Sequence, residues 1–220
     1  METTTEPEPA SVWLSIPDGY AALPLENISD TIAATGQLVA ELGTPQQRQA
    51  SDDVLGSLNA FLETLAERRA VYCGIGRHLS AINGQLITSS LVVTLLEFPG
   101  QRNPRLVLKD LLQGKVDAGE GGQPDLVDLP NGPALFFERT LMLPTPAVPQ
   151  QHVLTEGTES PVWQLEAFVP SPDGDKLATI EVSTPFAEHG PQYRTMTVTM
   201  AAGVRFRPPV GRDPLSALLG

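Results

Sequence analysis

The stretch KLATIEVSTPFAEHGPQYRTMTVTMAAGVRFR, residues 176–207, decides the fold of this chain. Its first part, residues 177–183, is rich in β-forming side chains and predicts a strand, which the following Thr-Pro pair ends. Residues 191–206 fit two patterns, because apolar side chains alternate as in a strand and also recur at intervals of three and four as in a helix. In either case both parts have one apolar side, so we expect them to pack on the same core.

Short turn signals divide much of the remaining chain into hairpins. Asn-Gly pairs at 83–84 and 131–132, and a Pro-Asp-Gly sequence at 172–174, each separate two runs of high strand propensity. The strand pairs predicted in this way are 71–77 with 85–98, 125–129 with 134–143, and 162–169 with 177–183. A further strand is predicted at 11–16, before a Pro-Asp-Gly turn.

Two longer helices are predicted upstream of the hairpins. An apolar stripe over residues 27–42 predicts the first, which a Gly-Thr-Pro sequence ends. The second is predicted over 51–70, with Ser51 as its N-cap and with Asp52 and Asp53 in its first turn, where the helix dipole favours negative charge.

Together these elements predict an α+β fold, with an antiparallel sheet of hairpins covered by helices. We expect the helices at 27–42, 51–70 and, if it is helical, 191–203 to cover one face of the sheet. A short helix is also predicted over residues 103–114, after the strand at 85–98. Pro104 fits its first turn, where a missing N–H breaks no helical hydrogen bond.

A single α+β domain is predicted over residues 11–207. Residues 1–10 are rich in Thr, Glu and Pro and are predicted to be a disordered tail. Residues 208–220 are predicted to be a second tail with a short amphipathic turn. The proline-containing segment 144–161 is predicted to be a long connection or a lid.

The chain carries a net charge of -12, and the charge is unevenly placed. Residues 1–67 contain eleven acidic residues and a single base, Arg48, whereas residues 68–220 contain fifteen acids and thirteen bases. This acidity disfavours nucleic acid and anionic membranes as partners and favours a basic protein. The alternative is that the acidic side chains only keep the domain soluble.

Other features of the composition predict a cytoplasmic protein. No apolar run approaches the ~20 residues that a membrane-spanning helix needs, and the first residues lack the basic and apolar regions of a secretory signal. The one cysteine, Cys73, excludes an internal disulfide and a cysteine-based zinc site.

Three segments carry a resemblance to a known family: VWLSIPDGYAALPL, the hairpin YCGIGRH…NGQLITSSLVVTLLEF, and KLATIEVSTPF…YRTMTVTMAAGVRF. They resemble the PsbP-like superfamily, which includes a photosystem II subunit, a Ran-binding nuclear import factor and bacterial effector-associated chaperones. The resemblance implies a PsbP-like α/β sandwich, with a helix over 191–203 that lies on the sheet and a short extended end at 204–207. It also implies that the protein acts by binding other proteins. No functional residue is carried over, since fold does not fix function.

No catalytic or metal-binding pattern stands out. Gly74-Ile75-Gly76 follows a predicted helix and does not open one, so it is a poor phosphate loop and a better strand bulge or packing site. Cys73 and His78 are five residues apart, which places them on opposite faces if they share a strand. The three histidines have no metal-ligand spacing, so we predict no cofactor.

Carboxylates and aromatic residues within the predicted strands are the remaining candidates. Glu97, Glu138, Glu166 and Glu181 are expected to pair across the sheet with bases such as Arg77 or Arg139. Phe136 and Phe137 point to opposite faces of a regular strand, so one of them needs a cover, either from the domain itself or from a partner.

The leading hypothesis is a non-enzymatic, protein-binding adaptor or chaperone-like domain. The candidate partner-binding residues are Glu26, Asp30, Glu41, Asp52, Asp53, Phe137 and Trp163. Two alternatives remain open: a carrier of a small apolar ligand held between sheet and helices, and an enzyme of unknown class.

Overall fold

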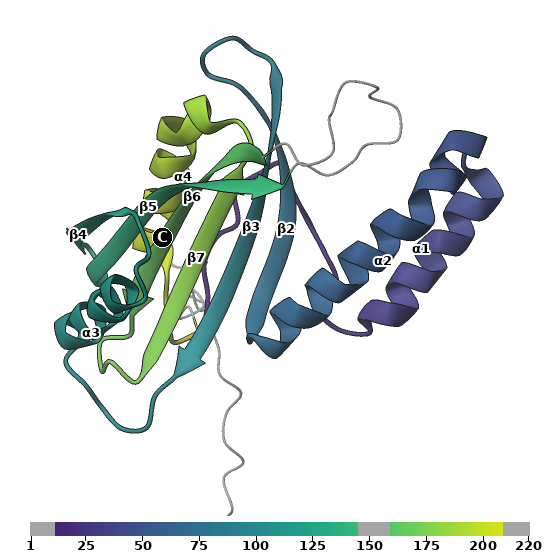
Figure 1. The fold of residues 1–220 in the computed structure, drawn as a ribbon. Helices are drawn as coiled ribbons and strands as arrows, with labels where there is room; N and C mark the ends of the chain where they lie inside the picture. The colour runs from purple at the N-terminus through teal and green to yellow at the C-terminus, as the bar shows by residue number, and fades with distance from the viewer. Residues whose placement is uncertain (1–11, 145–158, 209–220) are drawn as a thin grey trace, which may run out of the picture.

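A computed structural model describes residues 12–144 and 159–208, and these form an α+β fold around one open antiparallel sheet (Figure 1). The strand order is β1-β2-β3-β7-β6-β5-β4. The strands are β1 (Tyr20–Ala22), β2 (Ala70–Leu79), β3 (Leu86–Glu97), β4 (Gln123–Leu129), β5 (Gly132–Pro144), β6 (Glu159–Pro170) and β7 (Lys176–Thr184). The helices are α1 (Ile28–Leu42), α2 (Pro45–Glu67), α3 (Pro104–Asp117) and α4 (Gly190–Gly203). All three predicted hairpins are present, as β2–β3, β4–β5 and β6–β7.

The ambiguous stretch near the end of the chain is helical. Pro191 lies in the first turn of α4, where its missing N–H breaks no helical hydrogen bond. The buried side chains of this helix include Tyr193, Thr197 and Met200, which recur at intervals of four and three. Among the described residues after the helix there is a single bridge, in which Arg205 pairs with Trp13 through two backbone hydrogen bonds of 2.9 and 2.8 Å. The helix that the resemblance implied is therefore present, with a minimal extended end.

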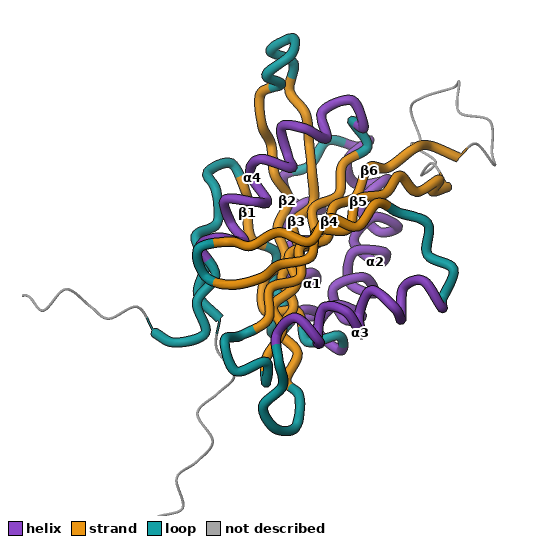
Figure 2. The backbone as a smooth tube through the Cα atoms, turned by 90° about the vertical axis from the view of Figure 1, so that its left-hand side faces the viewer, coloured by secondary structure: helices purple, strands orange, loops and turns teal. Residues whose placement is uncertain are grey.

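Helices lie on both faces of the sheet (Figure 2). Helix α4 lies on the face opposite to α2, so the prediction that the helices at 27–42, 51–70 and 191–203 cover one face is wrong. The larger core lies between the sheet and α4, and its fully buried side chains include Leu91, Phe136 and Ile180. On the opposite face α3 packs on Leu135, Phe137 and Phe168 of the neighbouring strands. Alternation along each strand supplies apolar side chains to both faces, and so both need a cover.

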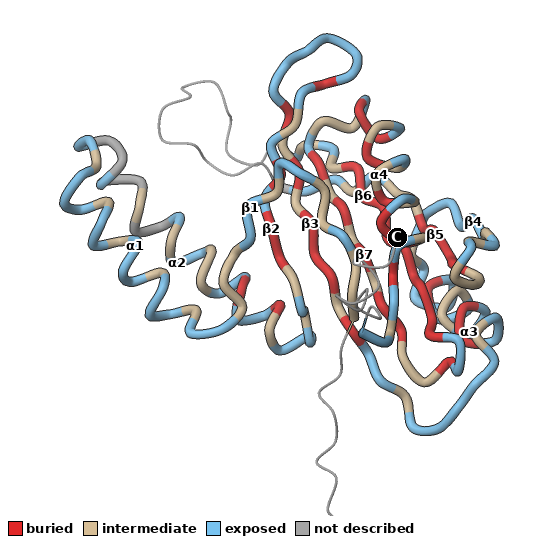
Figure 3. The backbone as a smooth tube through the Cα atoms, turned by 180° about the vertical axis from the view of Figure 1, so that it is seen from behind, coloured by how far each residue is buried: buried red, intermediate tan, exposed pale blue. Residues whose placement is uncertain are grey.

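Helices α1 and α2 form a hairpin, which we call the arm, that leans away from the sheet (Figure 1). Only the end of α2 reaches the sheet, where Leu62 and Leu65 pack with Cys73 and Val92. None of the 15 residues of α1 is buried, and most of the arm is exposed or intermediate in Figure 3. The prediction that the 27–42 helix covers the sheet is therefore wrong, because α1 packs on α2 instead.

Some element boundaries also differ from the predictions. Residues 12–16 contribute only the Trp13 bridge, and the first strand is β1. Helix α2 starts at Pro45, so Ser51 lies inside the helix, where its hydroxyl donates to the carbonyl of Arg48 and caps nothing. Helix α3 begins as predicted, with the Asn103 side chain accepting from the Arg105 N–H, but it continues past Gly114 to Asp117.

Three segments with predicted behaviour lie partly or wholly outside the described residues. They are the tail at 1–10, the connection between β5 and β6, and the tail at 208–220. Within the described residues, no helix is long and apolar enough to cross a membrane.

Candidate functional site

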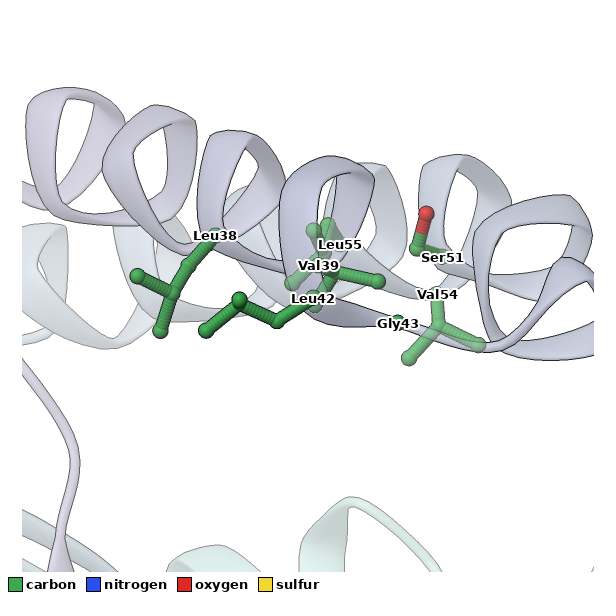
Figure 4. A pocket seen from close by; sticks show the side chains of 7 residues that line it. All are labelled: Leu38, Val39, Leu42, Gly43, Ser51, Val54 and Leu55. Carbon is green, nitrogen blue, oxygen red and sulfur yellow. The ribbon is translucent and has the colours of Figure 1, made fainter.

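The distal end of the arm carries an apolar groove, which we call the tip groove. It has a volume of about 500 Å³ and is open to solvent. Its lining residues are Leu38, Val39, Leu42, Gly43, Ser51, Val54 and Leu55. The exposed fractions of Leu38, Leu42 and Val54 are 60%, 79% and 61%, and Figure 4 shows these three side chains on the same side of the hairpin. A contiguous cluster of large exposed aliphatic side chains is uncommon on a soluble protein and is typical of an interaction site.

The sequence places these side chains together through helix spacing and a tight connection. Leu38 and Leu42 are four residues apart and therefore share one face of α1. Helix α1 ends at Leu42, and its C-cap is Gly43, whose N–H donates to the Val39 carbonyl over 2.8 Å. Pro45 opens α2 two residues later, so Val54 and Leu55 return beside the end of α1.

The acidic residues predicted to bind a partner separate into two groups. Glu41 adjoins Leu42, and Asp52 and Asp53 precede Val54 in the sequence, so these three lie on the helical turns that form the tip groove. Glu26 and Asp30 lie at the other end of the arm, near β1. Both are exposed, so the structure leaves them accessible but does not bring them to the groove.

The two aromatic candidates for partner binding are buried, which contradicts a docking role for them. Phe137 is 2% exposed beneath α3, and the Lys115 ammonium lies 4.6 Å from its ring centroid. Trp163 is 4% exposed, and its indole N–H donates to Glu138 Oε1 over 2.8 Å. The domain itself therefore supplies the cover that the sequence required for Phe137.

A polar network occupies the sheet face beside α3. Lys115 Nζ lies 2.7 Å from Glu166 Oε2 and 2.9 Å from Glu120 Oε2. Arg139 donates to Glu120 Oε2 and to Gln164 Oε1, each over 2.6 Å. The expected pairing of strand carboxylates with Arg139 is thus confirmed for Glu166, which lies 3.9 Å from its guanidinium.

Glu181 lies directly across the sheet from Glu166 and completes this network. Burial, together with the Glu166 charge, raises the pKa of Glu181, although a hydrogen bond from Gln164 opposes this. The hydrogen bond from Lys115 lowers the pKa of Glu120. Two neighbouring carboxyls with separated pKa values occur in acid–base catalysis. Here, however, Lys115 and Arg139 already hold Glu120 and Glu166, and the Gln164 amide and Ser183 hydroxyl hold Glu181, which is typical of a structural network.

A Ser–His–Glu arrangement that sequence reasoning missed joins the β2–β3 turn to the start of α4. Ser80 Oγ lies 2.7 Å from His189 Nε2, and His189 Nδ1 lies 3.3 Å from Glu188 Oε1. The order resembles that of a hydrolase triad. Ser80 is only 5% exposed, and its oxygen accepts from the N–H groups of Ile82 and Asn83. A nucleophile needs access and a free lone pair, so this arrangement fastens the turn and is not equipped for attack.

Cys73 and His78 lie on opposite faces of β2, as their spacing predicted. Cys73 packs against α2, and burial raises the pKa of its thiol to about 11. His78 stacks edge-on with Tyr20 and Tyr193 on the other face, and burial lowers its pKa. Gly76 leaves the space that the Tyr20 and His78 rings occupy. Gly76 is paired with Ser89 within the β2–β3 ladder. It therefore allows neighbouring side chains to pack closely and does not form a phosphate-binding loop.

Comparisons with known proteins add no family to this description. No family model matches the chain, and no curated protein matches it either. The resemblance to the PsbP-like superfamily therefore stays a prediction. Among the described residues, no group of three or more His, Cys, Asp or Glu side chains is arranged to hold a metal ion.

Proposed function

We propose that this chain is a non-enzymatic protein-binding domain, of the adaptor or chaperone kind, whose tip groove receives a basic amphipathic segment of another protein. The observation that carries the proposal is the exposed apolar groove on helices that add little to the core of the sheet. An isolated short helix is marginal in water, and most helical stability in proteins comes from packing of the apolar face. A partner seated in the tip groove would supply packing that α1 lacks.

The charge of the arm favours a basic partner. Residues 26–67 contain one base, Arg48, and the acids Glu26, Asp30, Glu41, Asp52, Asp53, Glu63 and Glu67. Complementary charge speeds association and suppresses partners of like charge. The same balance argues against nucleic acid and anionic membranes.

A groove between two helices suits a helical segment whose apolar side chains recur every three to four residues. Leu38 and Leu42 on one helix and Val54 and Leu55 on the other would contact such a segment from both sides. A cytoplasmic location is part of this proposal and agrees with a single cysteine that burial keeps as a neutral thiol.

The two alternatives have less support. A carrier of a small apolar ligand requires a pocket between sheet and helices, whereas the tip groove lies between two helices and is open. An enzyme requires an accessible reaction centre, and the two arrangements that resemble one, at Ser80 and at Glu181, are occupied by hydrogen bonds within the fold.

The experiment measures binding of a fluorescent synthetic peptide of leucine and lysine with helical spacing, by fluorescence anisotropy on the full chain. We expect binding that weakens with salt, because exposed charges are screened. Leu42→Asp should weaken it by about tenfold or more, which corresponds to ~1.4 kcal/mol. A triple variant, Glu41→Gln with Asp52→Asn and Asp53→Asn, should weaken it at low salt only.

Two matched controls locate the effect. Leu126→Asp replaces a leucine that is 54% exposed on β4 and should leave peptide binding unchanged. Glu26→Gln with Asp30→Asn removes charge at the base of the arm and should have a smaller effect than the triple variant. Equal binding by Leu42→Asp and wild type, or tighter binding of a leucine–glutamate peptide, would contradict the proposal.

A further inference from the structure

The turn of the β2–β3 hairpin presents a second apolar surface, which we call the β2–β3 tip and define as residues 79–86. The exposed fractions of Leu79, Ile82 and Leu86 are 69%, 68% and 49%. Leu79 and Leu86 are cross-strand partners at the end of the ladder, so their side chains lie next to each other. Figure 1 shows this hairpin extending beyond the neighbouring strands. The β2–β3 tip is therefore an apolar protrusion, whereas the tip groove of the arm is an apolar hollow.

The β2–β3 tip is held in place and is not a loose loop. Ser80 is fastened to His189 as described, and the Ala81 N–H donates to Gln192 Oε1 over 2.8 Å. Gln192 also donates to the Leu79 carbonyl over 3.0 Å. Five polar contacts thus fix a turn whose three large side chains belong to none of the buried core clusters. A preorganised apolar protrusion loses little conformational entropy on binding.

The charge around this hairpin is opposite to that of the arm. Residues 68–96 contain no acidic residue, and Arg77 is the base of this segment that adjoins the tip, because Arg68 and Arg69 lie at the opposite end of β2. Arg77 shares a strand face with Leu79 and is exposed, and it forms no ion pair within the described residues. Asp18, an exposed acid, adjoins Gly19, whose carbonyl accepts from the Arg77 N–H over 3.0 Å.

We infer that the β2–β3 tip of one copy docks in the tip groove of a second copy. Leu79, Ile82 and Leu86 would fill the groove, and Arg77 would face the acids of the arm. This inference rests on the proposed function, because it assigns an occupant to the same groove. Each copy offers one protrusion and one hollow, so the contact is heterologous and leads to open chains or rings. The small surfaces involved make the association weak and concentration-dependent.

The test is sedimentation velocity of the full chain from low micromolar to submillimolar concentration. We expect the average mass of the wild type to rise with concentration and to fall again with salt. Ile82→Asp removes the protrusion and Leu42→Asp removes the hollow, so each variant alone should remain monomeric. Both residues are highly exposed, so neither substitution threatens the fold.

A mixture of the two variants is decisive. The intact tip of the Leu42→Asp chain fits the intact groove of the Ile82→Asp chain, so the mixture should form heterodimers and nothing larger. Arg77→Gln should weaken wild-type association, because it removes the charge that would face the acids of the arm, and Leu126→Asp should leave it unchanged. A wild type that stays monomeric, a single variant that associates like the wild type, or a mixture that stays monomeric would each overturn the inference.

The leucine–lysine peptide separates this inference from the function on which it rests. If the peptide binds the tip groove while the wild type stays monomeric, the proposed function as a protein-binding domain stands. The inference that a second copy occupies the groove then fails. If Leu42→Asp affects neither peptide binding nor self-association, both proposals fail. Ile82→Asp should bind the peptide as well as the wild type, since its groove is intact.

Discussion

The sheet with α4 and the arm both contain apolar stripes but use them differently. Between the sheet and α4, side chains such as Phe136, Ile180 and Val182 are completely buried. On the arm, Leu42 is 79% exposed and α1 has no buried residue. The comparison teaches that the apolar content of a helix does not reveal whether its own domain or another molecule covers it.

The largest effect should come from the core. Phe136→Ala removes a fully buried ring between the sheet and α4, and we expect it to lower the free energy of unfolding by about 3–5 kcal/mol. Leu42→Ala on the arm should change it by less than about 0.5 kcal/mol. Chemical denaturation followed by circular dichroism measures both. Similar losses for the two variants would mean that the arm is packed more tightly than its exposure indicates.

A somewhat smaller loss is expected at the polar network beside α3. Lys115→Met removes the cation that holds Glu166, both of which are about nine-tenths buried. An uncompensated buried carboxylate costs about 3 kcal/mol. Adding Glu166→Gln should restore part of the lost free energy of unfolding, because the unpaired charge is removed. If the loss came only from the shape of methionine, the double variant would be no more stable than Lys115→Met alone. The measurement is again chemical denaturation, with Lys109→Met on the exposed side of α3 as the matched control.

A gain smaller than that loss is expected from Glu181→Gln. Burial and Glu166 raise the pKa of Glu181 in the folded state, so the stability linked to its proton is present below the ordinary glutamate pKa and is lost as the pH rises through the raised value. The variant should therefore be more stable than wild type at neutral pH and equal to it at acidic pH. Thermal unfolding across this pH range measures the difference, and a gain that persists in acid would exclude titration as its cause.

The smallest effect concerns the arm alone. A Cβ at Gly36 would meet Leu55 at ordinary contact distance, and one at Gly56 would meet nothing. Both glycines are inside helices, so alanine should stabilise the arm by about 0.5–1 kcal/mol at each position. Hydrogen exchange should slow in α1 and α2 and stay unchanged in β3. Equal slowing in β3 would show that the arm and the sheet unfold together, which would remove the contrast between them.

Local signals in the sequence predicted most of the fold. The Asn-Gly turns placed two hairpins, because these residues adopt the backbone angles that tight turns require, as at Gly84 with φ of 70°. The start of α2 was missed because Ser51 is a good N-cap residue in isolation, whereas the chain entered the helix earlier at Pro45. Coverage of both sheet faces was missed because periodicity says which residues share a face but not which helix packs on it.

The sequence predicted the acidic residues of the candidate site but not the apolar groove between them. The acids near the tip groove follow from charge counting, but the groove itself depends on how α1 folds back on α2. The pairing of Lys115 with Glu166 joins residues far apart in the sequence, and the Ser80–His189 contact spans a still longer separation. Contacts of this kind are set by the sheet order and leave no local pattern.

Burial of Cys73 has a practical consequence for spectroscopy. The chain has no other cysteine, and a thiol whose pKa is raised to about 11 beneath α2 reacts slowly with maleimide reagents at neutral pH. A cysteine introduced at an exposed position, on the arm or at the hairpin turn, would then be the one labelled site. Spin labels or fluorophore pairs attached there would report distances within and between molecules without removal of the native residue.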